Sequence, residues 1–455
     1  MDKMEGIAYG MMDFMSKPFV DPDTAGWSRV KESLEKDNVK LFHVSASDKP
    51  ELIKYLDNAP NFESVPHPGK FRTAALYRNK TDLFATIEEI VQIADSLQPI
   101  PASKPKLCFL ITCQGTHYPA MGKQLYAESP VFRKHFDFCA VHVLKEYDID
   151  VKSFLEWDVV PGVVPEWMES PIKFLPYLLA LEYALFKQWE EWGIKPDYVL
   201  GLSFGEYGAA VFAGMITIEE AFKLIMTRII LMTENIKEEA FCVSQMGMTK
   251  YAEILAEAKT AVGMEEMWLD VSAINSPVQT CVVGHLKYVN QFAATCKKHW
   301  IKTLIKEYHP YHSSLTKPIL PEFLKTTSSI RYVPGTAKFI STVDGKLWET
   351  LDPNYFLDHL TGPVMSIGAV ETALAEGVTH FVEVGPHPII IQMVKDILQN
   401  NDPHAENKYT FVTSMTRKED DRLALLNSVG RLYTAGYDVN WENVDKFQGQ
   451  GGGQL

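Results

Sequence analysis

The sequence predicts an α/β fold, in which a parallel-sheet domain carries an inserted ferredoxin-like subdomain and follows a small α/β domain. Three observations support this prediction. From Leu107 onward, apolar strand-like runs alternate with amphipathic helical stretches, as in a parallel sheet covered by helices. Between about 244 and 307 the order becomes strand, helix, strand, strand, helix, strand, which is ferredoxin-like. A polar stretch with several prolines at 98–106 marks a linker that precedes both of these regions.

The domain boundaries follow from changes in this pattern. The first residues show weak periodicity, so we treat 1–36 as an N-terminal extension. A strand followed by a helical pattern predicts the small α/β domain over 37–104. The parallel-sheet domain then covers 105–410. The C-terminal linker covers 411–455, and its Gln/Gly-rich end predicts a tail from Gln448.

Individual elements are set by apolar runs and by the residues that end them. A long amphipathic helix is expected at 174–192, because Gly193 can end it. Strands are expected wherever short apolar runs lie between turn residues. They cover 39–45, 107–112, 198–200, 269–274, 278–283 and 301–305.

Composition narrows the class of protein. The chain has 455 residues and a formal net charge of −14, which argues against nucleic acid or an anionic membrane as a general partner. No basic leader is visible, and no stretch approaches the ~20 apolar residues that span a bilayer, so we expect a cytoplasmic protein. The six cysteines form no C-x-x-C pair, which predicts reduced thiols and neither a disulfide framework nor a metal site.

A candidate nucleophile lies in residues 201–205, which read GLSFG. This segment follows the expected strand 198–200 and opens an apolar helix, which is the context of a G-x-S-x-G nucleophile elbow. The flanking glycines allow a sharp turn that exposes the Ser203 hydroxyl above the helix N-terminus. A glycine-rich turn with a capping serine remains the alternative interpretation.

A serine hydroxyl needs a base within hydrogen-bond reach, and histidine is the usual one. Thirteen histidines compete for this role. His312 stands out, because it follows the expected strand 301–305 and precedes a polar helix start at Ser313. From the residues alone, a capping or packing histidine remains possible.

Arg228 is the third candidate site residue. It lies in an otherwise apolar helical run, where an unpaired guanidinium is costly to bury, so it needs an anionic partner. That partner is either a side chain in a structural salt bridge or a bound anion gripped by the planar fork.

Three motifs in order resemble the family of malonyl-CoA:acyl-carrier-protein transacylases and of polyketide and fatty-acid synthase acyltransferase domains. Residues 113–117 (CQGTH) resemble that family's G-Q-G-S-Q loop, 201–206 its G-H-S-x-G-E elbow, and 382–388 (VEVGPHP) its E-x-G-P-H-P segment. The resemblance covers about 105–445 and implies a hydrolase-like parallel-sheet domain. Residues 37–95 also resemble the linker between ketosynthase and acyltransferase.

The resemblance implies a serine–histidine dyad. Ser203 would be the nucleophile and His312 its base, oriented by the backbone carbonyl of His359. The oxyanion would be held by the backbone N–H groups of Gln114 and Phe204, the second of which the elbow itself also predicts. No cofactor or metal is implied, because a coenzyme A thioester is the substrate.

The resemblance also implies the partners and the acyl group. Arg228 would grip the free carboxylate of a malonyl group, bulky Tyr311 would disfavour a methylmalonyl branch, and Asn275 would line the pocket, although it is also an ordinary turn residue. The acceptor would be the phosphopantetheine thiol of an acyl carrier protein in polyketide or fatty-acid biosynthesis. Four departures from the family pattern put acyl specificity in more doubt than catalysis. They are Cys113, His117, Leu175 and Leu202.

Two other functions remain open. An acyl-thioester hydrolase would use the same dyad but admit water, and a non-catalytic docking module would keep only the fold. Basic residues before His312 either steer an acidic partner or form a solvated surface. They are Lys297, Lys298, Lys302 and Lys306.

Overall fold

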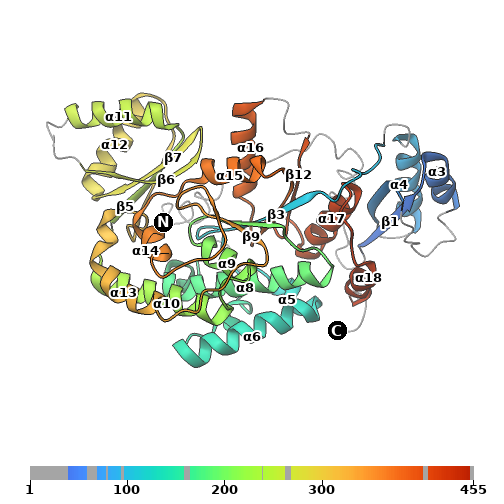
Figure 1. Cartoon of the computed structure of the whole chain (residues 1–455), viewed down its shortest axis with the longest axis horizontal. Coiled ribbons are helices and arrows are strands. Elements are labelled where there is room, and N and C mark those ends of the chain that lie inside the picture. The colour runs from blue at the N-terminus through green and yellow to red at the C-terminus, as the bar shows by residue number, and fades with distance from the viewer. Residues whose placement is uncertain are drawn as a thin grey trace.

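The computed structural model (Figure 1) describes residues 39–58, 69–77, 80–93, 97–157, 164–237, 239–261, 268–402 and 408–450. The expected N-terminal extension 1–36 and the residues after 450 lie outside the described residues. Among the described helices, none is both long and apolar enough to cross a membrane.

A six-stranded sheet forms the centre of the molecule, in the order β10-β9-β4-β3-β11-β12. All neighbouring pairs are parallel except β10 and β9. β3 is apolar and buried after its first residue, as expected of a strand covered on both faces. The strands are β3 (Lys106–Ile111), β4 (Tyr198–Gly201), β9 (Lys338–Ile340), β10 (Leu347–Trp348), β11 (Val378–Val384) and β12 (Thr410–Thr413).

Helices cover both faces of this sheet, with α8 and α6 on one side and α15 and α16 on the other (Figure 1). The helices of the first side are α5 (Lys123–Glu128), α6 (Pro130–Tyr147), α7 (Glu166–Glu169), α8 (Pro171–Glu191), α9 (Gly205–Phe212) and α10 (Ile218–Asn235), with the 3-10 turn η4 (Val151–Phe154). The later ones are η5 (Ser314–Ile319), α13 (Leu320–Thr327), α14 (Tyr355–Thr361), α15 (Ser366–Ala375) and α16 (Ile390–Asn401). The predicted parallel-sheet fold is confirmed.

The ferredoxin-like subdomain is a separate antiparallel sheet with two helices. Its strand order is β6-β7-β5-β8. Its elements are β5 (Glu239–Ser244), α11 (Met248–Ala261), β6 (Asp270–Ser276), β7 (Gln279–Gly284), α12 (Leu286–Lys298) and β8 (Thr303–Tyr308). The subdomain therefore begins at Glu239, five residues before the expected start.

The last strand of this subdomain also starts later than the expected 301. Trp300 adopts a left-handed φ of 58°, and Ile301 N–H donates to Cys296 O at 3.0 Å. Residues 299–301 therefore close the end of α12 and leave the strand to begin at Thr303.

The small N-terminal unit contains β1 (Lys40–Ala46) and β2 (Phe71–Tyr77), which pair antiparallel, with α3 (Lys49–Asn58) and α4 (Lys80–Ile93). Alternate residues of β1 face opposite sides. Phe42 and Val44 join a small core with α3 and α4, whereas Leu41 joins the main core.

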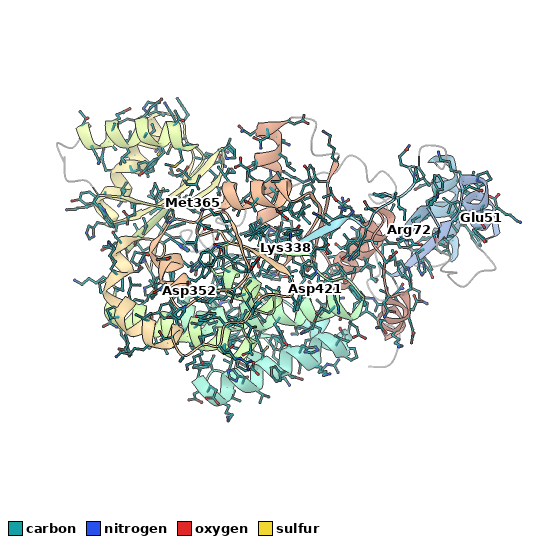
Figure 2. The ribbon with its side chains drawn as sticks, viewed as in Figure 1. Glu51, Arg72, Lys338, Asp352, Met365 and Asp421 are labelled. Atoms are coloured by element: carbon teal, nitrogen blue, oxygen red, sulfur yellow. The ribbon has the colours of Figure 1, made fainter. Side chains whose placement is uncertain are left out.

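The C-terminal helices α17 (Asp421–Thr434) and α18 (Trp441–Gln450) connect this N-terminal unit to the rest of the chain (Figure 1). Leu41 N–H donates to Gln448 Oε1 at 2.5 Å, and His43 stacks on Trp441 with ring centroids 3.5 Å apart. Arg72, which lies at this junction (Figure 2), pairs with Asp438 at 2.8 Å. The expected tail from Gln448 is wrong for 448–450, because those residues end a packed helix.

Candidate active site

Ser203 lies on a sharp turn between β4 and α9, with a left-handed φ of 52°. Left-handed backbone is rarely adopted by a residue with a side chain, and here the surrounding contacts impose it. A Cβ on Gly205 would lie 2.2 Å from Ile111 O, and one on Gly201 would lie 2.2 Å from Gly205 C. The two glycines therefore allow the close approach of helix and strand that the elbow requires.

The structure brings Ser203 and His312 together. Ser203 Oγ lies 2.6 Å from His312 Nε2, and His312 Nδ1 lies 2.8 Å from His359 O. Nδ1 must carry the proton to donate to that carbonyl, so the Nε2 lone pair accepts the serine hydroxyl. His312 also has a left-handed φ, of 58°, and its backbone N–H donates to Leu360 O at 3.0 Å. The last turn of α14 thus fixes both the backbone and the ring of His312.

The imidazole of His312 is neutral at pH 7. Burial, and to a smaller extent the nearby Arg228 guanidinium, lower its pKa to about 4. His359 is also buried, and burial holds its pKa well below the usual value. Its Nε2 lies 2.9 Å from Ser203 O, which ties α14 to the nucleophile turn. A neutral, oriented imidazole is the form that can take a proton from serine.

The two expected oxyanion donors lie on loops that leave the same sheet edge. Ile111, the last residue of β3, pairs in parallel register with Gly201, the last residue of β4. Leu202 N–H donates to Ile111 O at 3.1 Å, which keeps these loops adjacent. Phe204 N–H, at the start of α9, donates to no acceptor within the residues that the structure describes. Gln114 is half-buried on the loop after β3. Their role as donors stays a prediction.

Arg228 is only 2% exposed and lies between two aromatic rings. Its Cζ is 4.9 Å from the ring centroid of Tyr207 and 4.8 Å from that of Tyr311. Within the described part of the chain, no carboxylate lies within 4.0 Å of the guanidinium, and its Nε has no hydrogen-bond partner. The structural salt bridge considered above is therefore absent from the described residues, none of which places an anion beside this cation.

Asn275 makes its contacts inside the β6–β7 hairpin. Its Nδ2 donates to Gln279 Oε1 at 2.8 Å and approaches Cys281 Sγ at 3.4 Å. The hairpin reaches the main domain through Ile274 N–H, which donates to Val364 O at 2.9 Å. These contacts agree with a structural residue of the hairpin, and the pocket-lining role of Asn275 stays a prediction.

The four departures from the family motifs are all buried. Leu175 and Leu202 belong to the main core. His117 stacks on Phe174 with ring centroids 4.1 Å apart, its Nε2 lies 3.2 Å from Met168 O, and burial lowers its pKa to about 4. Burial also raises the pKa of the Cys113 thiol. None of these four side chains forms a hydrogen bond or a ring contact with Ser203 or His312.

Sequence reasoning missed the packing around the elbow. Tyr207 contacts Arg228, and its only sequence signal is its position one helical turn after Ser203. The carboxyl of Glu206 is buried, accepts from Tyr355 Oη at 2.5 Å and from Thr342 Oγ1 at 2.6 Å, and has its pKa raised by burial to about 7. Glu206 therefore ties the elbow helix to the loop after β9.

The four lysines before His312 differ in setting. Three of them, Lys297, Lys298 and Lys302, are exposed, and Lys298 lies 3.9 Å from Glu257. Lys306 is half-buried on β8, and burial lowers its pKa. No group of three potential metal ligands occurs among the described residues.

Comparison with known proteins identifies the family of the chain. Residues 108–439 match the family model of the acyl transferase domain. The non-reducing polyketide synthase albA of Aspergillus brasiliensis is 28% identical over 432 residues, which cover 90% of this chain and 19% of that protein. The chain thus spans about a fifth of the length of the curated relatives that it matches.

Solved structures show the same fold. The acyl transferase domain of ZmaA matches with a TM-score of 0.75 at 22% identity, over 90% of this chain and 96% of that one. FabD from Acinetobacter baumannii matches with a TM-score of 0.61 at 20% identity, over 73% of this chain and 100% of that one.

Proposed function

Because the chain belongs to the acyl transferase domain family, we propose that it transfers a malonyl-type acyl group from coenzyme A, through a Ser203 ester, to the phosphopantetheine thiol of an acyl carrier protein. The matched relatives are polyketide synthases, which supports a role in polyketide biosynthesis. One observation carries the proposal: beside a hydrogen-bonded serine–histidine pair lies a buried arginine with no anionic partner among the described residues.

The first half-reaction acylates Ser203. Neutral His312 takes the hydroxyl proton at Nε2 while Oγ attacks the thioester carbonyl, and Nδ1 stays bonded to the His359 carbonyl, which stabilises the imidazolium. The tetrahedral intermediate then collapses. The carbon–sulfur bond breaks, and the His312 proton passes to the departing coenzyme A thiolate.

The oxyanion of that intermediate is held by backbone N–H groups. We assign this role to Phe204 and Gln114, at the start of α9 and on the loop after β3. Donors fixed before the reaction need no reorganisation, and each commonly stabilises the transition state by ~3 kcal/mol. The chemistry of this site then requires neither a cofactor nor a metal.

Arg228 selects the acyl group. The guanidinium plane can bind a carboxylate through two parallel N–H groups, and burial strengthens that ion pair. A malonyl group offers such a carboxylate and an acetyl group does not. The ring of Tyr311, one residue before His312, narrows the space for a branch on the acyl chain.

The second half-reaction repeats the steps in reverse. His312 takes the proton of the carrier thiol, the thiolate attacks the Ser203 ester, and the serine leaves protonated. We place the reaction in the cytoplasm, since all six cysteines are unpaired, as a reducing compartment favours. The exposed Lys297 and Lys298 of α12, and Lys302 just before β8, would attract an acidic carrier domain.

Intact-mass spectrometry after brief incubation with malonyl-, methylmalonyl- and acetyl-CoA tests the proposal. We expect a malonyl increment on the wild type, none on Ser203→Ala, and loss of the increment when a carrier protein with its phosphopantetheine arm is added. Release of free malonate at the rate of coenzyme A release would instead identify a thioester hydrolase. No adduct and no coenzyme A release would identify a docking module.

A further inference from the structure

Tyr207 is a buried aromatic residue that contacts two parts of the site at once. Its ring lies under the Arg228 guanidinium and is perpendicular to the ring of His359, at a centroid distance of 5.5 Å. On this basis we propose that Tyr207 is a positioning residue for acyl selection, whose ring holds the Arg228 fork in the orientation that receives the acyl carboxylate. This inference rests on the function proposed above.

The ring of Tyr207 is itself held firmly. It stacks on Phe356 of α14 with centroids 4.6 Å apart and an interplanar angle of 11°, and the residue has no exposed surface. Tyr207 also lies on α9, one helical turn after Ser203. Its position is therefore fixed by two helices, which makes it a rigid support.

The Arg228 guanidinium depends on such support. An arginine that forms an ion pair is oriented by its partner, but the described residues provide no carboxylate within 4.0 Å of this one. It lies instead against the rings of Tyr207 and Tyr311, at 4.9 and 4.8 Å. Aromatic rings attract the flat face of a guanidinium, which leaves the N–H groups at its edge directed away from them. Two rings thus contact the guanidinium, and neither places an anion beside its N–H groups.

The predicted consequence is specific to acyl groups with a carboxylate. Without the Tyr207 ring, the guanidinium can rotate and loses part of its alignment with the carboxylate. Transfer of an acetyl group makes no use of the fork. The ratio of kcat/KM for malonyl-CoA to that for acetyl-CoA therefore reports the position of Arg228, whereas a general disturbance of α14 and His312 lowers both values together.

The test compares three variants by coenzyme A release and by crystal structure. Tyr207→Leu removes the ring, and Tyr207→Phe removes only the hydroxyl. Tyr198→Leu is the matched control, because Tyr198 also carries a cation over its ring, Lys338 at 5.2 Å, at the opposite end of β4. We expect Tyr207→Leu to lower the donor ratio about tenfold, the size of one buried cation–π contact. The other two variants should stay within about twofold of the wild-type ratio.

Each outcome decides a separate point. A parallel loss for both donors in Tyr207→Leu would overturn the inference and leave Tyr207 as a packing residue. An equal loss in Tyr207→Phe would assign the effect to the hydroxyl and overturn the role of the ring. If the wild type shows no preference for malonyl, the proposed function fails. In that case the crystal structure of Tyr207→Leu alone tests whether Tyr207 positions Arg228. An unmoved Arg228 guanidinium would overturn this role.

Discussion

His312 and His43 are two buried histidines in different junctions of the same molecule. Burial lowers the pKa of each to about 4, so both are neutral at pH 7. His312 has a hydrogen-bond partner at each ring nitrogen, Ser203 Oγ and His359 O. His43 lies flat on Trp441 between the N-terminal unit and α18, and within the described residues neither of its nitrogens has a partner.

The contrast shows that a lowered pKa does not identify a catalytic base. Partners at both nitrogens fix the tautomer and aim a lone pair at a hydroxyl, which makes His312 chemically useful. Stacking without partners uses the imidazole of His43 as a flat apolar surface. The predictions below test this difference, beginning with the largest effect.

Replacing each histidine should separate the two roles. His312→Ala removes the base that is hydrogen-bonded to Ser203, so acylation by malonyl-CoA should slow by about 10²–10⁴-fold. His43→Phe keeps a flat ring on Trp441 and should leave the rate within about twofold. Single-turnover release of coenzyme A measures both. A loss of similar size in the two variants would contradict the comparison.

Arg228→Ala should affect only one of the two histidines. It removes the expected partner of the acyl carboxylate, so kcat/KM for malonyl-CoA should fall about 100-fold, which corresponds to the loss of a buried charge-assisted hydrogen bond. The value of kcat/KM for acetyl-CoA should change little. The substitution also removes a positive charge that lowers the pKa of His312, which should rise, while the pKa of His43 stays unchanged. Steady-state kinetics and histidine NMR titration provide the measurements, with Arg331→Ala, an exposed arginine, as the control.

Stability at acid pH should depend on His43. Its folded pKa of about 4 lies below the unfolded value of 6.5, so the unfolded state binds the extra proton. The contribution of neutral His43 to the free energy of unfolding is fully present above pH 6.5 and is lost as the pH falls toward 4. Between pH 7 and pH 5 the loss is about 2 kcal/mol. Urea unfolding of His43→Phe should show a smaller loss over this range than the wild type. Identical losses would show that His43 titrates normally in the folded protein.

The smallest expected change is that of the acylation rate at mildly acidic pH. Because His312 keeps its neutral form down to a pKa of about 4, the acylation rate should vary by less than about twofold between pH 7 and pH 5 and fall near pH 4. An ordinary histidine would already be mostly protonated at pH 5. A rate that halves near pH 6.5 would show that the site is more hydrated than its burial indicates.

The sequence allowed much of this organisation to be predicted, where the signal was local. The parallel sheet and the ferredoxin-like order followed from periodicity, and both are confirmed by the strand orders of the two sheets. Motif order led to Ser203, His312 and the carbonyl of His359, which the structure places within hydrogen-bond distance of one another.

Other features depend on contacts between distant segments, for which the sequence has no local signal. The position of Tyr207 under Arg228 requires the packing of α9 against α10 and α14. The start of β8 depended on a tryptophan in the left-handed conformation that usually favours glycine. The packing of Gln448 against β1 joins residues that no periodicity relates.

That last contact has a consequence for synthesis of the chain. The acceptor for Leu41 N–H is 407 positions further along the chain, and the inner face of β1 packs on helices that the ribosome makes long after β1. At roughly 5–20 residues per second, the first strands wait about 20–80 s for those helices. During this interval the inner face of β1 is open to other chains. We expect nascent chains that end before α17 to bind a chaperone or to be cut by protease near residue 40, and chains that extend through α18 to resist both.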